Sequence, residues 1–323
     1  MVKRIGVLTS GGDAPGMNAC IRAIVRSAAH YGIEVTGIRR GYAGLLEGDA
    51  IPLDPRKVTH ILERGGTFLE TSRCEEMKTP EGIRKAVAMM HRMELEGLIT
   101  IGGDGTFRGA TELSKAGGFQ VIGVPGTIDN DVYGTDFTIG FDTAVNTALE
   151  ATDKIRDTAE SHNRLFFVEV MGRNRGFIAL AVGIAAGADE ILLPETETDL
   201  KALAESLKRC YRNGKRSAIV IVAEGDVPGG ARAIAERMQG LIDVEYRVVS
   251  LGHVQRGGSP TARDRILASE LGTAAVDAIA EGKSGYMVGM IASEIALTPL
   301  SDTWTKTKEL DARLLKMLRI LAV

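Results

Sequence analysis

The sequence predicts an α/β fold of two similar Rossmann-like lobes, each a mostly parallel sheet covered by helices on both faces. Short, continuously apolar runs alternate with longer amphipathic runs, which is typical of parallel strands buried on both sides. Several apolar runs end in glycine-rich turns, and glycine makes up 39 of the 323 residues. Since a domain holds roughly 150 residues, this length fits two domains.

The predicted elements follow one another without a long linker or a low-complexity segment. Apolar runs of strand length predict strands at 4–8, 34–38, 97–101, 120–124, 165–170, 191–193, 218–223, 247–251 and 286–291. Helical periodicity between them predicts helices at 18–31, 80–93, 106–115, 143–160, 175–186, 200–211, 230–241 and 261–280. The halves are expected to meet near residues 138–141, after a polar, glycine-rich stretch.

Composition narrows the class of protein. The 39 basic and 42 acidic residues give a net charge of −3, which gives no sign of a nucleic-acid or anionic-membrane partner. The run 177–188 is too short to span a bilayer, and the first residues contain no apolar signal core. The scattered Cys20, Cys74 and Cys210 fit reduced thiols, so we expect a cytoplasmic globular protein without a membrane or nucleic-acid partner.

Two glycine-rich turns follow predicted strands and open helices. The turn at 9–18 offers free N–H groups and a helix N-terminus, both suited to phosphate, and a purely structural tight turn is its alternative. The turn at 102–106 carries three glycines, which let the backbone close on a triphosphate. Asp104 in this turn is suited to hold Mg²⁺, although an aspartate there can also serve only as a helix cap.

Acidic and basic side chains gather after other strands. Asp129 and Asp131 follow the strand 120–124, where one can accept a proton from a substrate hydroxyl while the other faces a metal or cation. An Asx-rich turn is the simpler alternative. Arginines beside glycines at strand ends suit a phosphorylated sugar, because guanidinium binds phosphate in a bidentate manner. The polar set comprises Arg73, Arg164, Arg173, Glu224, Arg247, His253 and Arg256.

These motifs, in this order, resemble the bacterial ATP-dependent 6-phosphofructokinases nearly from end to end. Gly-Gly-Asp-Gly alone also occurs in other kinases, but the ordered set is highly specific. It comprises Leu-Thr-Ser-Gly-Gly-Asp-Ala-Pro-Gly-Met-Asn (8–18), Arg-Gly-Gly-Thr-Phe-Leu (64–69), Gly-Gly-Asp-Gly (102–105), Pro-Gly-Thr-Ile-Asp-Asn-Asp (125–131), Val-Glu-Val-Met-Gly-Arg (168–173), Gly-His-Val-Gln-Arg-Gly-Gly-Ser-Pro (252–260) and Asp-Arg-Ile-Leu-Ala-Ser (264–269).

The resemblance implies transfer of the γ-phosphoryl group of MgATP to the 1-hydroxyl of fructose 6-phosphate, the committed step of glycolysis. Asp129 would be the base, Thr127 and Arg173 would steady the transferred group, Asp131 would lie beside metal and phosphates, and Asp104 would hold Mg²⁺. The implied ATP site comprises Gly12, Arg73, Cys74, Gly103, Asp104, Gly105 and Thr106. The implied sugar-phosphate site comprises Thr127, Asp129, Arg164, Met171, Gly172, Arg173, Glu224, Arg247, His253 and Arg256.

The resemblance also implies quaternary and domain organisation. Arg164 and Arg247 would reach in from a neighbouring subunit of a homotetramer. The ATP- and Mg-binding lobe would take residues 1–140 and 255–302, and the sugar-phosphate lobe residues 141–254 and 303–323.

Two glycines help to predict whether ATP or pyrophosphate donates the phosphoryl group. Pyrophosphate-dependent relatives typically carry Asp where this chain has Gly105 and Lys where it has Gly126, so an open pocket favours ATP. Thr106 replaces the more common serine. The alternatives are a pyrophosphate-dependent enzyme, a kinase of tagatose 6-phosphate or sedoheptulose 7-phosphate, and a non-catalytic nucleotide sensor. The sensor would require loss of Asp129, Asp104 or Arg173, and all three are present.

Allosteric regulation by ADP or phosphoenolpyruvate is the least defined expectation. The residues that match the family's effector site between subunits are Arg22, Arg26, Arg156, Gly187, Asp189 and Lys215. Pro55, Asn213 and Ser217 stand where a well-studied type of member has basic side chains, and Asp189 replaces Glu. Because fewer cations weaken the binding of an anion, we expect an effector site that is retained but altered.

Overall fold

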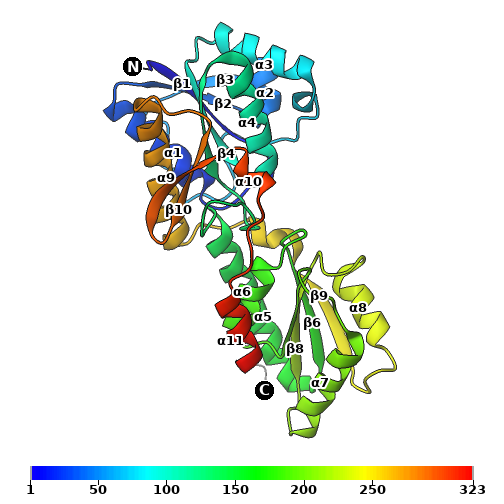
Figure 1. Ribbon diagram of the computed structural model, residues 1–323. Helices are drawn as coiled ribbons and strands as arrows, with labels where there is room; N and C mark the ends of the chain where they lie inside the picture. The colour runs from blue at the N-terminus through cyan, green and yellow to red at the C-terminus, as the bar shows by residue number, and fades with distance from the viewer. Residues whose placement is uncertain (1, 322–323) are drawn as a thin grey trace. The chain divides into compact units, whose positions relative to one another are not determined.

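The chain folds into two compact units, which the computed structural model in Figure 1 describes for residues 2–321. The larger unit comprises the described residues up to Ile128, Val132–Thr143 and Arg256–Lys308. The smaller unit comprises Asp129–Asp131, Ala144–Gln255 and the described residues from Glu309. Within residues 2–321, none of the helices combines the length and the apolar character needed to cross a membrane.

The larger unit is built on a seven-stranded sheet in the order β11-β10-β5-β4-β1-β2-β3. Neighbours from β10 to β2 are parallel, whereas the edge strands β3 and β11 pair antiparallel. Every residue of β4 is buried, as expected of a central strand covered on both faces. The strands are β1 (Arg4–Thr9), β2 (Glu34–Ile38), β3 (Ala50–Leu53), β4 (Gly97–Gly102), β5 (Gln120–Pro125), β10 (Tyr286–Ile291) and β11 (Glu294–Pro299).

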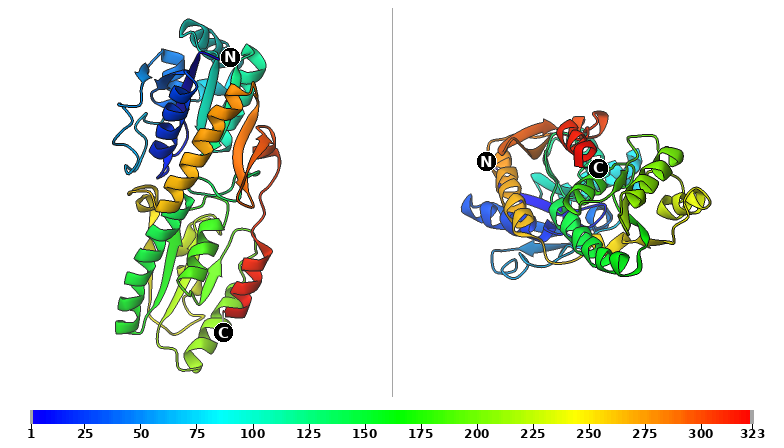
Figure 2. Two further views of the ribbon diagram at one scale, coloured as in Figure 1. Left: turned by 90° about the vertical axis from the view of Figure 1, so that its left-hand side faces the viewer. Right: turned by 90° about the horizontal axis from the view of Figure 1, so that it is seen from below.

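Helices cover both faces of this sheet. On one face α1 and α9 lie side by side (Figure 2). Gly272 of α9 allows this close approach, because a Cβ there would lie 2.9 Å from that of Ala23. On the other face α2, α3 and α4 share an apolar core with the sheet. The helices are α1 (Met17–His30), α2 (Gly41–Glu47), η1 (Glu76–Lys78), α3 (Pro80–Arg92), α4 (Asp104–Gly117), α9 (Ala262–Ala280) and α10 (Asp302–Thr305).

The smaller unit has a parallel four-stranded sheet in the order β7-β8-β6-β9. Helices α7 and α8 share one apolar core with it, while α6 packs against β7 and β8. The strands are β6 (Leu165–Val170), β7 (Glu190–Leu192), β8 (Ala218–Ala223) and β9 (Tyr246–Ser250). The helices are α5 (Phe141–His162), α6 (Phe177–Ala185), α7 (Leu200–Arg212), α8 (Gly230–Met238), η2 (Gly252–Arg256) and α11 (Ala312–Leu321).

The predicted fold class is confirmed: two α/β units carry mostly parallel sheets between helices. The predicted strands agree with the observed ones to within one residue at each end. The sequence analysis missed β3, β11, α2, α10 and α11. The two missed strands, β3 and β11, lie at the edges of the sheet and are short or half-exposed. Helix α2 contains two glycines, which weaken helical propensity.

The border between the units falls after Thr143, whereas the sequence analysis put it after residue 140. Helix α5 therefore begins in the larger unit and continues in the smaller one. Near the C-terminus the border follows Lys308 rather than residue 302.

Candidate active site

In the larger unit, glycine-rich segments follow the carboxyl ends of three neighbouring strands, β1, β4 and β5. The chain order reverses between β1 and β4, because β2 lies on one side of β1 and β4 on the other. Ligands of open α/β sheets bind in the crevice outside such a reversal point. The topology thus brings together three segments that are far apart in the sequence.

The segment after β1 is a tight turn with a positive charge against it. Gly11 and Gly16 have φ values of 89° and 105°, which glycine adopts at little cost. The Arg256 guanidinium donates a hydrogen bond to the Asp13 carbonyl over 3.0 Å, and a Cβ at Gly12 would collide with that guanidinium. Sequence reasoning assigned Gly12 to ATP and Arg256 to the sugar phosphate, and the structure places the two side by side.

A second loop is tied to the same turn. The Thr71 hydroxyl donates to the Gly11 carbonyl over 2.8 Å, and the exposed Arg73 and partly buried Cys74 follow two and three residues later. Cys74 packs against the apolar core under α2, α3 and α4. Both residues therefore lie on a loop anchored at the glycine-rich turn.

The segment after β4 forms the N-terminus of α4. The Thr106 hydroxyl donates to the Ser10 carbonyl over 2.9 Å, and the buried Tyr42 hydroxyl donates to the Thr106 carbonyl over 2.6 Å. These two bonds fix the first turn of α4 beside the turn after β1. The unpaired N–H groups at the start of a helix favour an anion. Serine could make the first of these bonds equally well, so the Thr106 departure from the family leaves that contact unchanged.

Asp104 begins α4, and its side chain is 46% exposed. One carboxylate oxygen accepts the Gly105 N–H over 2.7 Å, and the other lies 3.8 Å from the Arg108 guanidinium. Residues 2–321 contain no group of three or more His, Cys, Asp or Glu side chains that could hold a metal by themselves. Mg²⁺ commonly binds through one or two carboxylates plus substrate phosphates, so a single exposed carboxylate beside a glycine-rich turn fits Mg²⁺ that arrives with a nucleotide.

The two glycines related to donor choice differ in their surroundings. A Cβ at Gly105 would meet nothing within 4 Å, so this position faces open space. A Cβ at Gly126 would lie 2.9 Å from Ile101 and 3.1 Å from Met17. Gly126 is therefore required by packing within the larger unit, and only Gly105 has the open surroundings expected at both positions.

The segment after β5 carries Thr127, Asp129 and Asp131. The Thr127 N–H donates to the Ile139 carbonyl over 3.1 Å, and the Thr138 hydroxyl donates to the Thr127 carbonyl over 2.6 Å. Asn130 has a φ of 54°, a left-handed conformation that asparagine tolerates better than most residues. This conformation turns the backbone sharply between Asp129, which is 3% exposed, and the partly buried Asp131.

Asp129 and Arg173 form an ion pair, with Nε of Arg173 3.8 Å from a carboxylate oxygen of Asp129. The Asp129 side chain is 4% exposed, whereas the Arg173 side chain is 58% exposed. A buried carboxylate is thus paired with a guanidinium that still reaches solvent. Such a pair places a proton acceptor beside a group that can neutralise phosphate charge.

The turn that carries Arg173 is strained and clamped. Arg173 has a φ of 53° and Gly172 a φ of 141°. One carboxylate oxygen of Glu224 accepts the Arg173 N–H over 2.7 Å and the Gly172 N–H over 3.3 Å. Backbone strain at a non-glycine residue persists only where neighbours enforce it, and it concentrates at functional sites. Glu224, which sequence reasoning gave only to the sugar phosphate, enforces this turn.

The other sugar-side residues of the smaller unit lie at two opposite edges of its sheet. Met171, Gly172, Glu224 and His253 follow the carboxyl ends of β6, β8 and β9. Arg164 precedes β6, and Arg247 is next to the first residue of β9. The Arg164 side chain binds Glu245 over 3.0 Å, and Arg247 pairs with the same carboxylate. At about 3.3 Å per residue, β6 separates the two groups by roughly 20 Å.

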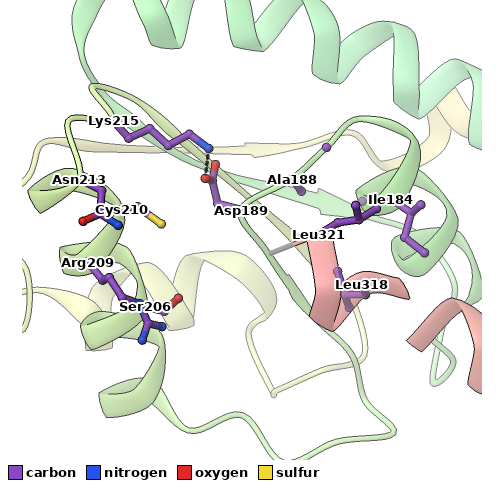
Figure 3. Close-up of a pocket in the computed structure, with 12 residues that line it drawn as sticks. Ile184, Ala188, Asp189, Ser206, Arg209, Cys210, Asn213, Lys215, Leu318 and Leu321 are labelled. Carbon is purple, nitrogen blue, oxygen red and sulfur yellow. Dashed lines mark hydrogen bonds and ion pairs between the residues drawn. The ribbon is translucent and has the colours of Figure 1, made fainter. Parts of the chain in front are cut away.

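Four of the six predicted effector residues lie together in the smaller unit. Gly187, Asp189 and Lys215 line a cavity of about 420 Å³, and Arg156 donates to the Gly187 carbonyl over 3.2 Å. The Lys215 ammonium pairs with the buried Asp189 carboxylate (Figure 3). Arg22 and Arg26 lie on α1 of the larger unit.

Sequence reasoning missed part of this cavity. Arg209 and Cys210 on α7 face it, and Leu318 and Leu321 of α11 form another wall (Figure 3). The missed signal was the amphipathic spacing of Leu314, Leu318 and Leu321 at the end of the chain. The position of Arg209 could not be found in this way, because a basic residue in the last turn of a helix is common on any surface.

The phosphofructokinase family model matches residues 4–279. The chain belongs to the phosphofructokinase family. A relative from Thermus thermophilus, named ATP-dependent 6-phosphofructokinase 1, is 58% identical over the full length of both chains. An ATP-dependent 6-phosphofructokinase from Halothermothrix orenii is 49% identical, again over the full length of both.

Solved phosphofructokinase structures share the fold. The Pichia pastoris phosphofructokinase in the T-state matches with a TM-score of 0.90 and 34% identity, covering 100% of this chain and 39% of that one. This chain therefore spans well under half the length of that fungal chain. A pyrophosphate-dependent phosphofructokinase from Marinobacter aquaeolei matches with a TM-score of 0.84 over 97% of this chain and 86% of that one. Its identity of 23% supports the fold alone.

Proposed function

We propose that this chain transfers the γ-phosphoryl group of MgATP to the 1-hydroxyl of fructose 6-phosphate, giving fructose 1,6-bisphosphate and ADP, the committed step of glycolysis. Full-length relatives named ATP-dependent 6-phosphofructokinase support the substrates. The observation on this chain that supports the chemistry most is the buried Asp129 carboxylate 3.8 Å from the exposed Arg173 guanidinium. The proposal puts the reaction in the cytoplasm, in keeping with free Cys20, Cys74 and Cys210.

In the proposed mechanism Asp129 accepts the proton of the sugar's 1-hydroxyl while that oxygen attacks the γ-phosphorus. The new O–P bond forms as the bond to the bridging oxygen of ADP breaks. Arg173 and Thr127 neutralise and orient the phosphoryl group in transit, and Asp131 lies beside the phosphates. Mg²⁺ held by Asp104 and the nucleotide supplies further charge neutralisation when bound. Such catalysis depends on positioning and electrostatics, so these few groups suffice.

Substrate binding divides between the two units. In the larger unit Gly12, Gly103, Gly105 and Thr106 present backbone groups to the nucleotide phosphates, with Arg73 and Cys74 on the neighbouring loop. In the smaller unit Met171, Gly172, Glu224 and His253 line the sugar side. Arg256 donates a hydrogen bond to the Asp13 carbonyl beside Gly12, and in the proposal its guanidinium binds the sugar phosphate.

A coupled assay for fructose 1,6-bisphosphate tests the function and the donor together. The purified protein receives Mg²⁺ and fructose 6-phosphate, with ATP in one arm and pyrophosphate in the other. We expect product with ATP only. Gly105→Asp should lower kcat/KM for ATP by about 10-fold or more, because it places a negative charge in the open space beside the phosphates.

Gly105→Ala is the matched control for this experiment. Its methyl group would meet nothing within 4 Å, so activity with ATP should stay close to wild type. Equal or faster product with pyrophosphate would contradict the donor assignment. No product in either arm would contradict the substrate assignment, and tagatose 6-phosphate and sedoheptulose 7-phosphate would then be tested.

We further propose a homotetramer in which each sugar site is shared. Arg164 and Arg247 lie roughly 20 Å from the residues at the carboxyl ends of the same sheet, which is more than one hexose phosphate spans. Their guanidinium groups meet at Glu245 and remain partly exposed, with side chains 26% and 47% accessible. They are therefore suited to bind a phosphate held by a neighbouring copy of the chain.

The cavity around Asp189 and Lys215 is proposed as an effector site for ADP or phosphoenolpyruvate. The Pichia pastoris phosphofructokinase that is similar to this chain was solved in the T-state, which supports this proposal. Either ligand should shift the half-saturating concentration of fructose 6-phosphate, and Lys215→Met should remove most of that shift while maximal velocity stays unchanged. Saturation curves at rising effector concentration provide the measurement. Curves that coincide with and without both effectors would make the site vestigial.

A further inference from the structure

Asp264 is a buried carboxylate to which the proposed mechanism gives no role. It occupies the first turn of α9 and is 1% exposed. Thr261 caps this helix by accepting the Asp264 N–H over 3.3 Å. In a capping box the acidic side chain would return to the backbone of Thr261. The Asp264 carboxylate instead reaches a different segment of the larger unit.

That segment is residues 138–143, which we call the supporting segment. One oxygen of Asp264 accepts the Gly140 N–H over 2.9 Å. The other accepts the Thr143 N–H over 2.8 Å and the Thr143 hydroxyl over 2.5 Å. Burial raises the pKa of Asp264, while the bonds from Thr143 and Gly140 act in the opposite direction. A carboxylate that is costly to bury is thus matched to three donors of one short segment.

The supporting segment in turn holds the loop after β5. The Ile139 N–H donates to the Pro125 carbonyl over 2.9 Å, and the Ile139 carbonyl accepts the Thr127 N–H over 3.1 Å. The Thr138 hydroxyl donates to the Thr127 carbonyl over 2.6 Å. Both peptide groups that flank Thr127 are therefore bonded to Thr138 and Ile139, the two residues that precede Gly140. Asp129 follows only two residues later.

Asp264 also lies beside the turn after β1, through its Cβ and its backbone carbonyl. Gly16 has a φ of 105°, and a Cβ there would lie 2.7 Å from Ile139 and 3.6 Å from Asp264. Gly140 is equally tight, since its Cβ would lie 2.6 Å from that of Ala14. The supporting segment thus packs closely against the turn after β1, and hydrogen bonds to Asp264 tie it to the start of α9.

We propose that Asp264 is a positioning residue for phosphoryl transfer, which acts through the supporting segment to keep Thr127 and Asp129 at their working positions. It touches neither of these residues. This inference rests on the proposed function, because it takes from it the roles of Thr127 and Asp129. A misplacement of about 1 Å can lower turnover by about 10²-fold, so small movements of this segment would be felt in the chemical step.

The test compares Asp264→Ala, Asp264→Asn and wild type at a temperature where all three are folded. We expect Asp264→Ala to lower kcat by about 10- to 10²-fold, with KM for ATP and fructose 6-phosphate within about twofold of wild type. Asp264→Asn keeps one acceptor oxygen, so its kcat should lie between those of Asp264→Ala and wild type. Hydrogen exchange without ligands should be faster in peptides covering residues 125–143 of Asp264→Ala.

Asp199→Ala is the matched control, because Asp199 also accepts two backbone N–H groups, but at the start of α7. It should lose thermal stability while its kcat stays within about twofold of wild type. The proposal is overturned if folded Asp264→Ala keeps the wild-type kcat, or if Asp199→Ala lowers kcat by as much as Asp264→Ala does. Should Asp264→Ala fail to fold, Thr143→Val removes one of the three donors, and an unchanged kcat there overturns the proposal equally.

The exchange measurement separates this inference from the proposed function. If wild type makes no fructose 1,6-bisphosphate, the function fails. Slower or unchanged exchange at 125–143 in the Asp264 variants would then overturn the positioning role without reference to any substrate.

Discussion

Asp129→Ser is expected to lower kcat by at least about 10²-fold, because a positioned base contributes about 10²–10⁴ in rate. The carboxylate is 3% exposed and lies 3.8 Å from the Arg173 guanidinium. Serine keeps a small polar group there but cannot accept the hydroxyl proton at neutral pH. Binding of fructose 6-phosphate should stay largely intact, since the sugar is held mainly by other residues. Steady-state kinetics together with calorimetric titration of the sugar phosphate measure the two effects separately.

Asp153→Ser serves as the control for this prediction, because Asp153 is an exposed residue of α5. Its kinetics should match wild type. Asp129→Asn, which keeps the shape of the side chain, should be as inactive as Asp129→Ser. Near-normal turnover in either Asp129 variant would remove this residue from the role of base, and lost sugar binding with normal kcat would make it a binding residue instead.

Mixing two inactive variants is expected to restore activity if the sugar site is shared between subunits. The first variant is Asp129→Ser, and the second combines Arg164→Ser with Arg247→Ser. In the second, loss of two phosphate ligands should lower kcat/KM for fructose 6-phosphate by at least about 10²-fold. In random hybrids about a quarter of the sites would pair an intact Asp129 with intact arginines from a neighbour. Hybrid activity should therefore exceed either parent by about 10-fold or more.

The control mixes Asp129→Ser with Arg173→Gln. Asp129 and Arg173 form an ion pair within one chain, so no hybrid of these two variants contains a complete pair. Its activity should equal the average of the parents. If the mixture of Asp129→Ser with the Arg164 and Arg247 double variant also showed only the average activity of its parents, each chain would complete its own site. Full activity of a protein that sediments as a monomer would lead to the same conclusion.

The central strands and the glycine-rich segments could be predicted because their signals are local. Residues 97–102 are apolar or glycine apart from Thr100 and lead into Gly103, and the observed strand and helix start follow this change in pattern. The grouping of Asp104 with Gly12 and Thr127 also followed from sequence, because carboxyl ends of neighbouring parallel strands share one edge of a sheet. The phosphofructokinase family was visible from the same ordered motifs.

Elements with weak local signals were missed. Strand β11 is half-exposed and ends the sheet, so its side chains carry little alternation. Helix α11 lies beyond the motifs, so the apolar wall that it gives to the cavity around Asp189 and Lys215 was not predicted either. The packing of Gly126 against Ile101 and Met17 was equally hidden, because a glycine in the sequence does not reveal which neighbour its missing side chain would meet.

By itself, the sequence determined the α/β class and the glycine-rich turns after the strands, and its resemblance to the family named Asp129 and Arg173 as candidate chemistry. Only the tertiary structure decided that Arg164 and Arg247 meet at Glu245. It alone linked Asp264 to Gly140 and Thr143, across more than a hundred residues of chain. The physical reason is that turns and strands are specified by neighbouring residues, whereas a buried carboxylate finds its donors only after distant segments have packed together.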